Sequence, residues 1–153
     1  MGSVAEWGTM SVMNKIFNAA AIYTALGLIA GVYYREFTRF NDFPLTEPTS
    51  LGTVHTHILV LGTIVHLVLL ALAASLKIHK VKLFDTFFIV YNLGLIWTVG
   101  FMVVKGSLQV TQPGFEFSAG LAGASGLGHV VLTIAFIQLF MVIKRAMNRM
   151  HAE

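Results

Sequence analysis

The chain has 153 residues, of which 56% are hydrophobic and only 11% charged, whereas soluble domains average about 25% charged residues. A soluble domain of this length cannot bury so much apolar surface, so the sequence predicts a protein embedded in a lipid bilayer. The lack of cysteine excludes disulfides, iron–sulfur clusters, zinc–thiolate sites and covalently attached c-type haem, and a net charge of +3 is too small and scattered to indicate nucleic-acid binding.

Four apolar stretches are long enough to cross a membrane, because one transmembrane helix needs about 20 apolar residues. The first predicted helix covers 13–37, and a loop with Pro44 and Pro48 follows it. The second covers 50–76 and ends at the basic turn 77–82. The third covers 83–105, and the fourth covers 119–143 after a polar loop at 107–118. We therefore expect residues 1–153 to form one all-α domain, an integral membrane four-helix bundle.

The charges at the ends of these helices predict an orientation. The N-terminus, the 77–82 turn and the C-terminus share one end of the bundle, and this end carries Lys15, Lys77, Lys80, Lys82, Lys144, Arg145 and Arg149. The other end carries Arg35, Arg39 and Lys105, together with Glu36, Asp42, Glu47 and Glu116. Since Lys and Arg are enriched in cytoplasmic loops, we expect both termini to be cytoplasmic.

Four of the six histidines fall inside the predicted spans, where an ionisable residue is costly and marks a candidate functional site. His55 and His57 lie one to two turns from the outer end of the second helix, and His129 lies two to three turns from the outer end of the fourth. These three residues therefore share a layer of the membrane. His66 lies about 13 Å deeper than His57, with no histidine at its level, and is left out of the predicted site.

The relative directions of His55 and His57 limit what they can bind. At about 100° per residue they point about 160° apart, so one chain cannot offer both to one ion, which argues against a compact zinc or copper site. Neutral imidazoles in a dry, aromatic-rich layer suit the iron of a b-type haem. Arg35 and Arg39, at the outer end of the first helix, are candidate partners of haem propionates. Their alternative role is to anchor the interface through lipid phosphates.

Two resemblances extend this interpretation. The run Leu51-Gly-Thr-Val-His-Thr-His-Ile-Leu-Val-Leu-Gly62 resembles the His-x-His helix of haem–copper oxidase and nitric oxide reductase catalytic subunits, in which the two histidines serve different haems. Most of the chain resembles a family of small bacterial four-helix membrane proteins of unassigned function. The matching stretches are Tyr34-Arg-Glu-Phe-Thr38, His55-Thr-His57 with Leu59-Val-Leu-Gly62, Tyr91-Asn92 with Gly94, and Gly123 through Gly128-His129. Unlike the oxidases, the single chain has only four predicted helices and no three-histidine set for a copper centre.

Together these observations favour a protein that binds haem b non-covalently, with His55, His57 and His129 as candidate axial ligands of the iron. The expected role is redox, electron-transfer or gas chemistry at the outer side of the bacterial cytoplasmic membrane, resembling a minimal haem–copper oxidase unit. The electron donor, the acceptor and any catalytic residues stay unassigned. The alternatives are a histidine-based metal-ion carrier or sensor, and an accessory membrane subunit without a cofactor.

The two histidine directions also predict assembly, since an imidazole that faces lipid is unfavourable and a neighbouring copy would receive it. In a closed ring, one copy would offer His55 and the next His57 to a shared haem. The resemblance to the oxidase core, built as three arcs of four helices, favours a trimer. The rows Gly27/Gly31 and Gly120/Ala124/Gly128 are candidates for close helix contacts. The rival is a monomer or two-fold dimer that pairs His57 with His129 within one chain.

Overall fold

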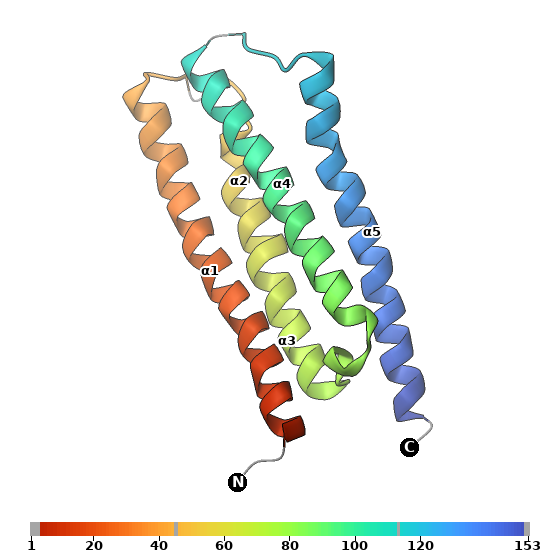
Figure 1. The fold of residues 1–153 in the computed structure, drawn as a ribbon. Helices are drawn as coiled ribbons and strands as arrows, with labels where there is room; N and C mark the ends of the chain where they lie inside the picture. The colour runs from red at the N-terminus through yellow and green to blue at the C-terminus, as the bar shows by residue number, and fades with distance from the viewer. Residues whose placement is uncertain (1–3, 45, 113, 152–153) are drawn as a thin grey trace.

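The computed structural model describes residues 4–44, 46–112 and 114–151. The chain forms α1 (Val4–Phe40), α2 (Leu51–His57), the π-helix η1 (Ile58–Ile64), α3 (Val65–Ser75), the 3-10 helix η2 (Ile78–Lys80), α4 (Leu83–Thr111) and α5 (Ala119–Met150). Because α2, η1 and α3 follow one another directly, they make one long helix, and the described residues form four such helices in all (Figure 1). The predicted all-α fold is confirmed.

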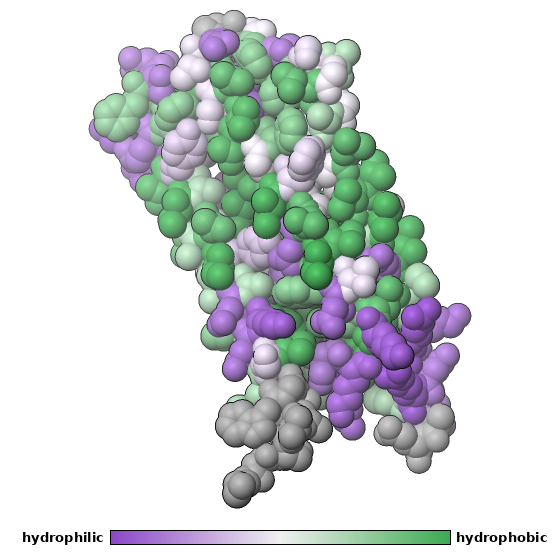
Figure 2. All heavy atoms as spheres, viewed as in Figure 1, coloured by the Kyte–Doolittle hydropathy of each residue, from purple (hydrophilic) through white to green (hydrophobic). Residues whose placement is uncertain are grey.

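Each of the four helices is long and apolar enough to cross a membrane, over Met10–Phe40, Leu51–Ser75, Leu83–Thr111 and Ala119–Met150. Only 22–28% of the residues in their most apolar windows are buried. A protein in water would not leave so much apolar surface uncovered. Figure 2 shows a broad band of hydrophobic residues, with hydrophilic residues gathered towards the ends. The structure thus supports a multi-pass membrane protein.

Three of the four helices are longer than the apolar runs that predicted them, and the second, over Leu51–Ser75, agrees with the predicted 50–76 to within one residue at each end. The third and fourth begin at Leu83 and Ala119, as expected, but α1 begins at Val4 and not at 13. At their far ends α4 continues to Thr111 and α5 to Met150, instead of 105 and 143. The physical reason is that hydropathy marks only the residues within the apolar part of the membrane. Polar residues outside that part can continue the same pattern of helical backbone hydrogen bonds.

The sequence predicted an uninterrupted α-helix over 50–76, and the π-helix η1 in its middle is a correction. A π-helix bonds i to i+5 and often marks a functional position. Two carbonyls of η1 accept side-chain hydrogen bonds: Leu61 from the hydroxyl of Tyr91 at 2.8 Å, and Gly62 from Nδ1 of His66 at 2.5 Å. The donor from Tyr91 comes from a different helix, so the apolar pattern of this helix could not reveal the change of helix type.

The four helices are arranged in an open row. α1 packs along α2, η1 and α3; α4 packs against α2 with smaller contacts to η1 and η2; and α5 packs along α4. As a result α1 and α5 lie at opposite edges of the row (Figure 1). Lipid chains are as apolar as the side chains, so membrane helices have no hydrophobic reason to close around a single core. The row leaves the outward faces of α1 and α5 available to lipid or to another protein.

Small residues allow neighbouring helices to approach closely at several places, and two of these contacts involve α4. A Cβ atom added at Gly106 of α4 would fall against the backbone nitrogen of Leu51, at the start of α2. A Cβ atom at Gly128 of α5 would fall against the hydroxyl of Thr98 on α4. The backbone nitrogen of Ser50 also donates to the side-chain carbonyl of Gln109 at 2.9 Å. These contacts fix the start of α2 on α4, and α5 on the other side of α4.

Candidate functional site

His57 is oriented by a hydrogen bond to the backbone of its own helix. Its Nδ1 lies 2.9 Å from the carbonyl oxygen of Thr53, one turn earlier on α2. A carbonyl only accepts, so Nδ1 carries the proton and the lone pair of the neutral ring is on Nε2. Metal-ligating histidines are commonly oriented by such a bond to a backbone carbonyl. The ring is half-buried, in a row with Thr53, Val60 and Ile64, all of which are exposed.

The side chain of His55 lies on a different side of α2, near α1. Its Cβ atom lies 3.8 Å from the position that a Cβ atom would take at Gly31 of α1. The Nδ1 atom is buried and has no hydrogen-bond partner among the described residues, and Nε2 lies 3.3 Å from the hydroxyl of Thr56. His55 is therefore a half-buried imidazole near α1, whereas His57 lies in the exposed row of the same helix.

His129 is exposed on α5, directly after the tightly packed Gly128. The part of α5 before it is loosely packed: Cβ atoms added at Gly120, Gly123 and Gly126 would meet nothing within 4 Å. Both α2 and α5 begin at the same end of the molecule (Figure 1). At about 1.5 Å per residue, His57 lies about 9 Å from the start of α2 and His129 about 15 Å from the start of α5. The two imidazoles are thus at similar depths.

The single chain does not gather the predicted ligands into one polydentate site. Among the described residues, no three His, Asp or Glu side chains are grouped so that they could hold a metal ion. His55 lies near α1, His57 on the exposed row of α2, and His129 on the exposed face of α5.

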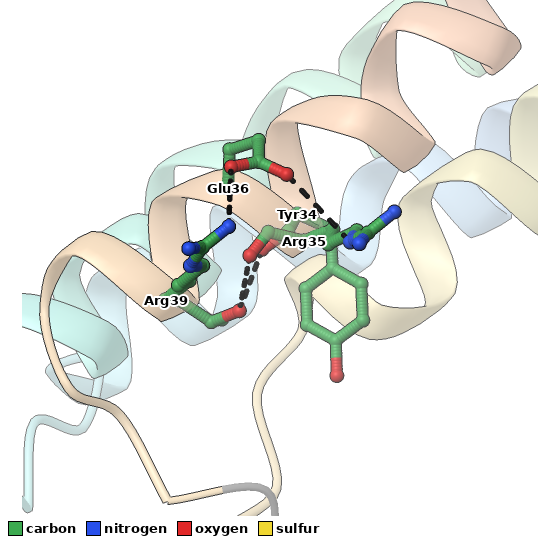
Figure 3. Close-up of polar contacts among 5 residues, drawn as sticks. Tyr34, Arg35, Glu36 and Arg39 are labelled. Atoms are coloured by element: carbon green, nitrogen blue, oxygen red, sulfur yellow. Dashed lines mark hydrogen bonds and ion pairs between the residues drawn. The ribbon is translucent and has the colours of Figure 1, made fainter.

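Arg35 and Arg39 are exposed at the end of α1 that leads into α2. Figure 3 shows Glu36 between them, with its two carboxylate oxygens 3.6 Å from Nε of Arg35 and 3.9 Å from Nη1 of Arg39. The two arginine side chains are 80% and 77% exposed. Ion pairs as exposed as these contribute little to stability, so both guanidinium groups are free to exchange Glu36 for another anion.

The most buried of the membrane histidines is His66, which the predicted site left out. Its side chain is 0% exposed, and its ring lies 5.2 Å from the ring of Tyr23, 5.6 Å from Phe88 and 5.8 Å from Tyr91, between ring centroids. The Nδ1 proton is donated to the carbonyl of Gly62, and Nε2 is buried without a hydrogen-bond partner among the described residues. Close by, the hydroxyl of Tyr23 donates to Oδ1 of Asn92 at 2.7 Å.

The predicted site omits His66 because no second histidine lies at its depth. The partners of His66 are in fact aromatic rings from α1 and α4 and a carbonyl of its own helix. One sequence signal could have placed His66 in the core, because it belongs to a row of apolar and small residues spaced three or four apart. The structure buries every member of this row: Leu51, Val54, Ile58, Gly62, His66, Leu69 and Ala73.

The row of four membrane-length helices, with His57 and His129 on its outward faces, His55 beside α1 and His66 in its core, defines a polytopic helical membrane protein. A family model matches residues 13–146, and the chain belongs to that family, the proteins of unknown function DUF2871. The expected membership of a family without an assigned function is therefore confirmed. No curated protein and no solved structure matches the chain, and the resemblance to haem–copper oxidases stays a prediction.

Proposed function

We propose that the protein is a membrane-embedded b-type haem protein with a redox, electron-transfer or gas-chemistry role. The observation that carries the proposal is the hydrogen bond from Nδ1 of His57 to the carbonyl of Thr53, because it leaves the Nε2 lone pair available on an exposed row of α2. Haem would supply one-electron chemistry and an iron site for a diatomic gas. The protein supplies an oriented imidazole in an apolar layer.

The open row of helices supports a haem held between copies of the chain. His57 and His129 lie on outward surfaces at similar depths, and the exposed glycines at 120, 123 and 126 leave the backbone of α5 accessible to a flat ligand. A polar imidazole at membrane depth is stabilised when a ligand or a second subunit covers it. A homo-oligomer follows, with a trimer as the favoured state because of the resemblance to the three-arc oxidase core.

The cationic side chains at the outer end complete the proposed pocket. Arg35 and Arg39 lie where α1 leads into α2, a few turns from His55 and His57, and share one exposed carboxylate. Exchange of Glu36 for a propionate would give each guanidinium a charge-assisted partner. The charge difference between the two ends of the row supports cytoplasmic termini, which would put the haem near the outer side of the bacterial cytoplasmic membrane.

The metal-carrier alternative is less well supported by the arrangement of the described side chains. A carrier or sensor for zinc or copper needs three or four ligands around one ion, and no such group of His, Asp or Glu occurs among those residues. A haem iron needs only one or two axial imidazoles, and separate surfaces can provide these.

The absorption spectrum of the full chain, purified in mild detergent, tests the proposal. We expect a Soret band that shifts on reduction, and we expect His57→Ala to remove it or convert it to another coordination state. Ile64→Ala, on the same exposed row, is the matched control and should leave the spectrum unchanged. A normal spectrum in the His55→Ala/His57→Ala double variant, or a colourless wild-type protein from haem-replete cells, would contradict the proposal.

Native mass spectrometry tests the shared site by counting chains and haems together. We expect equal numbers of chains and haems in an oligomer that loses haem as it dissociates. A monomer that keeps a six-coordinate haem on dilution would overturn the shared site and leave the single-chain pair of His57 and His129. Reporter fusions at residues 114 and 151 test the orientation, and an extracytoplasmic signal at 151 would reverse it.

A further inference from the structure

A small pocket lies at the end of the molecule that carries both termini, between the α3–α4 turn and the last turns of α5. It has a volume of about 90 Å³ and is lined by Leu76, Lys77, Lys80, Ala146, Arg149 and Met150. Three of the six residues are cationic and none is acidic. Figure 2 shows the hydrophilic residues gathered at this end, directly below the hydrophobic band. The pocket therefore combines positive charge with the boundary of the membrane-spanning region.

The backbone holds the three cations together. Lys77 has a left-handed conformation, with φ of 54°, which turns the chain sharply after α3 and starts η2. Arg149 donates from Nη1 to the backbone carbonyl of Lys80 at 2.9 Å, so the end of α5 is tied to η2. Because this bond uses the backbone of Lys80, it leaves the ammonium group of that residue free to bind an anion.

The apolar side of the pocket continues along α5. Leu76, Ala146 and Met150 form its uncharged lining. From Met150 an apolar stripe with helical spacing runs towards the middle of the membrane, through Met147, which is 44% exposed, and the half-buried Ile143 to Phe140, which is 70% exposed. A ligand that fits both parts has an anionic group at the pocket and a hydrocarbon chain that lies on this stripe.

We propose that this pocket binds the phosphate headgroup of an anionic phospholipid, with an acyl chain along the Phe140–Met147–Met150 stripe. Basic pockets between transmembrane helices are suited to such headgroups, because each Lys or Arg adds attraction and the membrane boundary places the phosphate at the right depth. The guanidinium group of Arg149 can form paired hydrogen bonds to phosphate oxygens. This proposal is independent of the haem proposal and of the side of the membrane on which the termini lie.

Native mass spectrometry of the full chain in an uncharged detergent tests the site with two lipids of equal chain length, phosphatidylglycerol and phosphatidylcholine. We expect the wild type to bind phosphatidylglycerol about 10-fold more tightly, because three converging cations act on one phosphate. The Lys77→Gln/Lys80→Gln variant should lose most of this preference. It keeps the hydrogen bond from Arg149 to the backbone of residue 80, so the fold of this end is not disturbed.

The control variant Lys144→Gln/Arg145→Gln removes the same charge from the same end of the molecule, at two residues of α5 that do not line the pocket. It should change the preference by less than about 3-fold. Equal losses in the two double variants, or no preference in the wild type, would overturn the proposal in favour of a diffuse surface charge.

A second arm separates a lipid from a soluble anion. Inorganic phosphate in millimolar excess should fail to displace phosphatidylglycerol, since the acyl chain contributes part of the binding. If inorganic phosphate displaced phosphatidylglycerol, the pocket would be a soluble phosphate site, and the assignment to lipid would be overturned. Arg149→Lys keeps the charge and removes the paired donors, and it should weaken phosphatidylglycerol binding by a smaller factor than Lys77→Gln/Lys80→Gln.

Discussion

His57 and His66 lie on one continuous helix, and each points Nδ1 at the carbonyl four residues earlier, yet their surroundings differ. The carbonyl is that of Thr53 for His57, on an exposed row, and that of Gly62 for His66, whose side chain is 0% exposed. The same local bond leaves Nε2 of His57 available to a ligand and encloses Nε2 of His66 among aromatic rings. The surroundings of a membrane histidine therefore depend on the neighbouring helices and not on the hydrogen bond within its own helix.

The largest expected effect separates the two residues in stability. His66→Ala removes a fully buried ring and its side-chain hydrogen bond to the carbonyl of Gly62, so we expect it to destabilise the protein by about 3 kcal/mol. His57→Ala should cost less than about 1 kcal/mol, because its site is partly exposed. Reversible unfolding in mixed micelles, followed by circular dichroism, measures both. Equal decreases in the free energy of unfolding for the two substitutions would contradict the difference between the two sites.

The haem spectrum should respond in the opposite order, with a larger change for His57→Ala than for His66→Ala. His57→Ala is expected to change the Soret band, whereas a His66→Ala protein that stays folded should keep it, because His66 lies deeper and is enclosed by side chains. A lost Soret band in folded His66→Ala protein would place the haem at the buried histidine. The same purified samples serve for both measurements.

The second expected effect concerns two glycines of the same long helix, one in tight contact with α1 and one in ordinary contact with it. A Cβ atom at Gly62 would lie 2.6 Å from Cβ of Tyr23, so Gly62→Ala has to push α1 away from η1 and should cost about 2 kcal/mol. A Cβ atom at Gly52 would lie at an ordinary 3.6 Å from the ring of Tyr34. Gly52→Ala should therefore be neutral, or stabilising by up to about 1 kcal/mol through helix propensity. The unfolding assay above distinguishes the two, and a neutral Gly62→Ala would contradict the tight contact.

A smaller effect tests the hydrogen bond that joins α4 to the π-helix. Tyr91→Phe removes the side-chain hydrogen bond to the carbonyl of Leu61 in the core and should cost about 1 to 2 kcal/mol. Tyr33→Phe is the control, because the hydroxyl of Tyr33 is exposed and pairs with Ser107 at 3.0 Å. We expect the control to change the free energy of unfolding by less than about 0.5 kcal/mol. A result in the reverse order would show that this bond does not stabilise η1.

The smallest effect is a pH dependence at His79, in η2, outside the spans. Burial, and next the neighbouring Lys80, hold the pKa of His79 below its ordinary value of 6.5. As the pH falls through 6.5, the unfolded chain takes up this proton before the folded chain does, so stability decreases towards the lowered pKa. His79→Asn should reduce this loss, and His151→Asn, at an exposed residue, should not. An unchanged pH slope in His79→Asn would contradict the shift.

Much of the architecture follows from the sequence alone. Apolar runs long enough to span a bilayer gave four helices, and the starts at Leu83 and Ala119 follow the basic turn and the polar loop before them. The 160° separation of His55 and His57 rests on helix geometry, which holds over Leu51–His57 because η1 begins only at Ile58. These features depend on the chain within a few turns, where local hydrogen bonding and transfer into lipid decide the structure.

Other features were decided only by the tertiary structure. The hydroxyl of Tyr91, from a different helix, bonds to the π-helical segment, and the rings of Tyr23 and Phe88 enclose His66. The open row exposes His129 while it packs Gly128, the next residue, against Thr98. Hydropathy treats adjacent positions of a membrane helix alike, because lipid and protein interior are equally apolar. Which side of a helix meets a neighbour therefore depends on shape and hydrogen bonding between helices, and these appear only when the chain is folded.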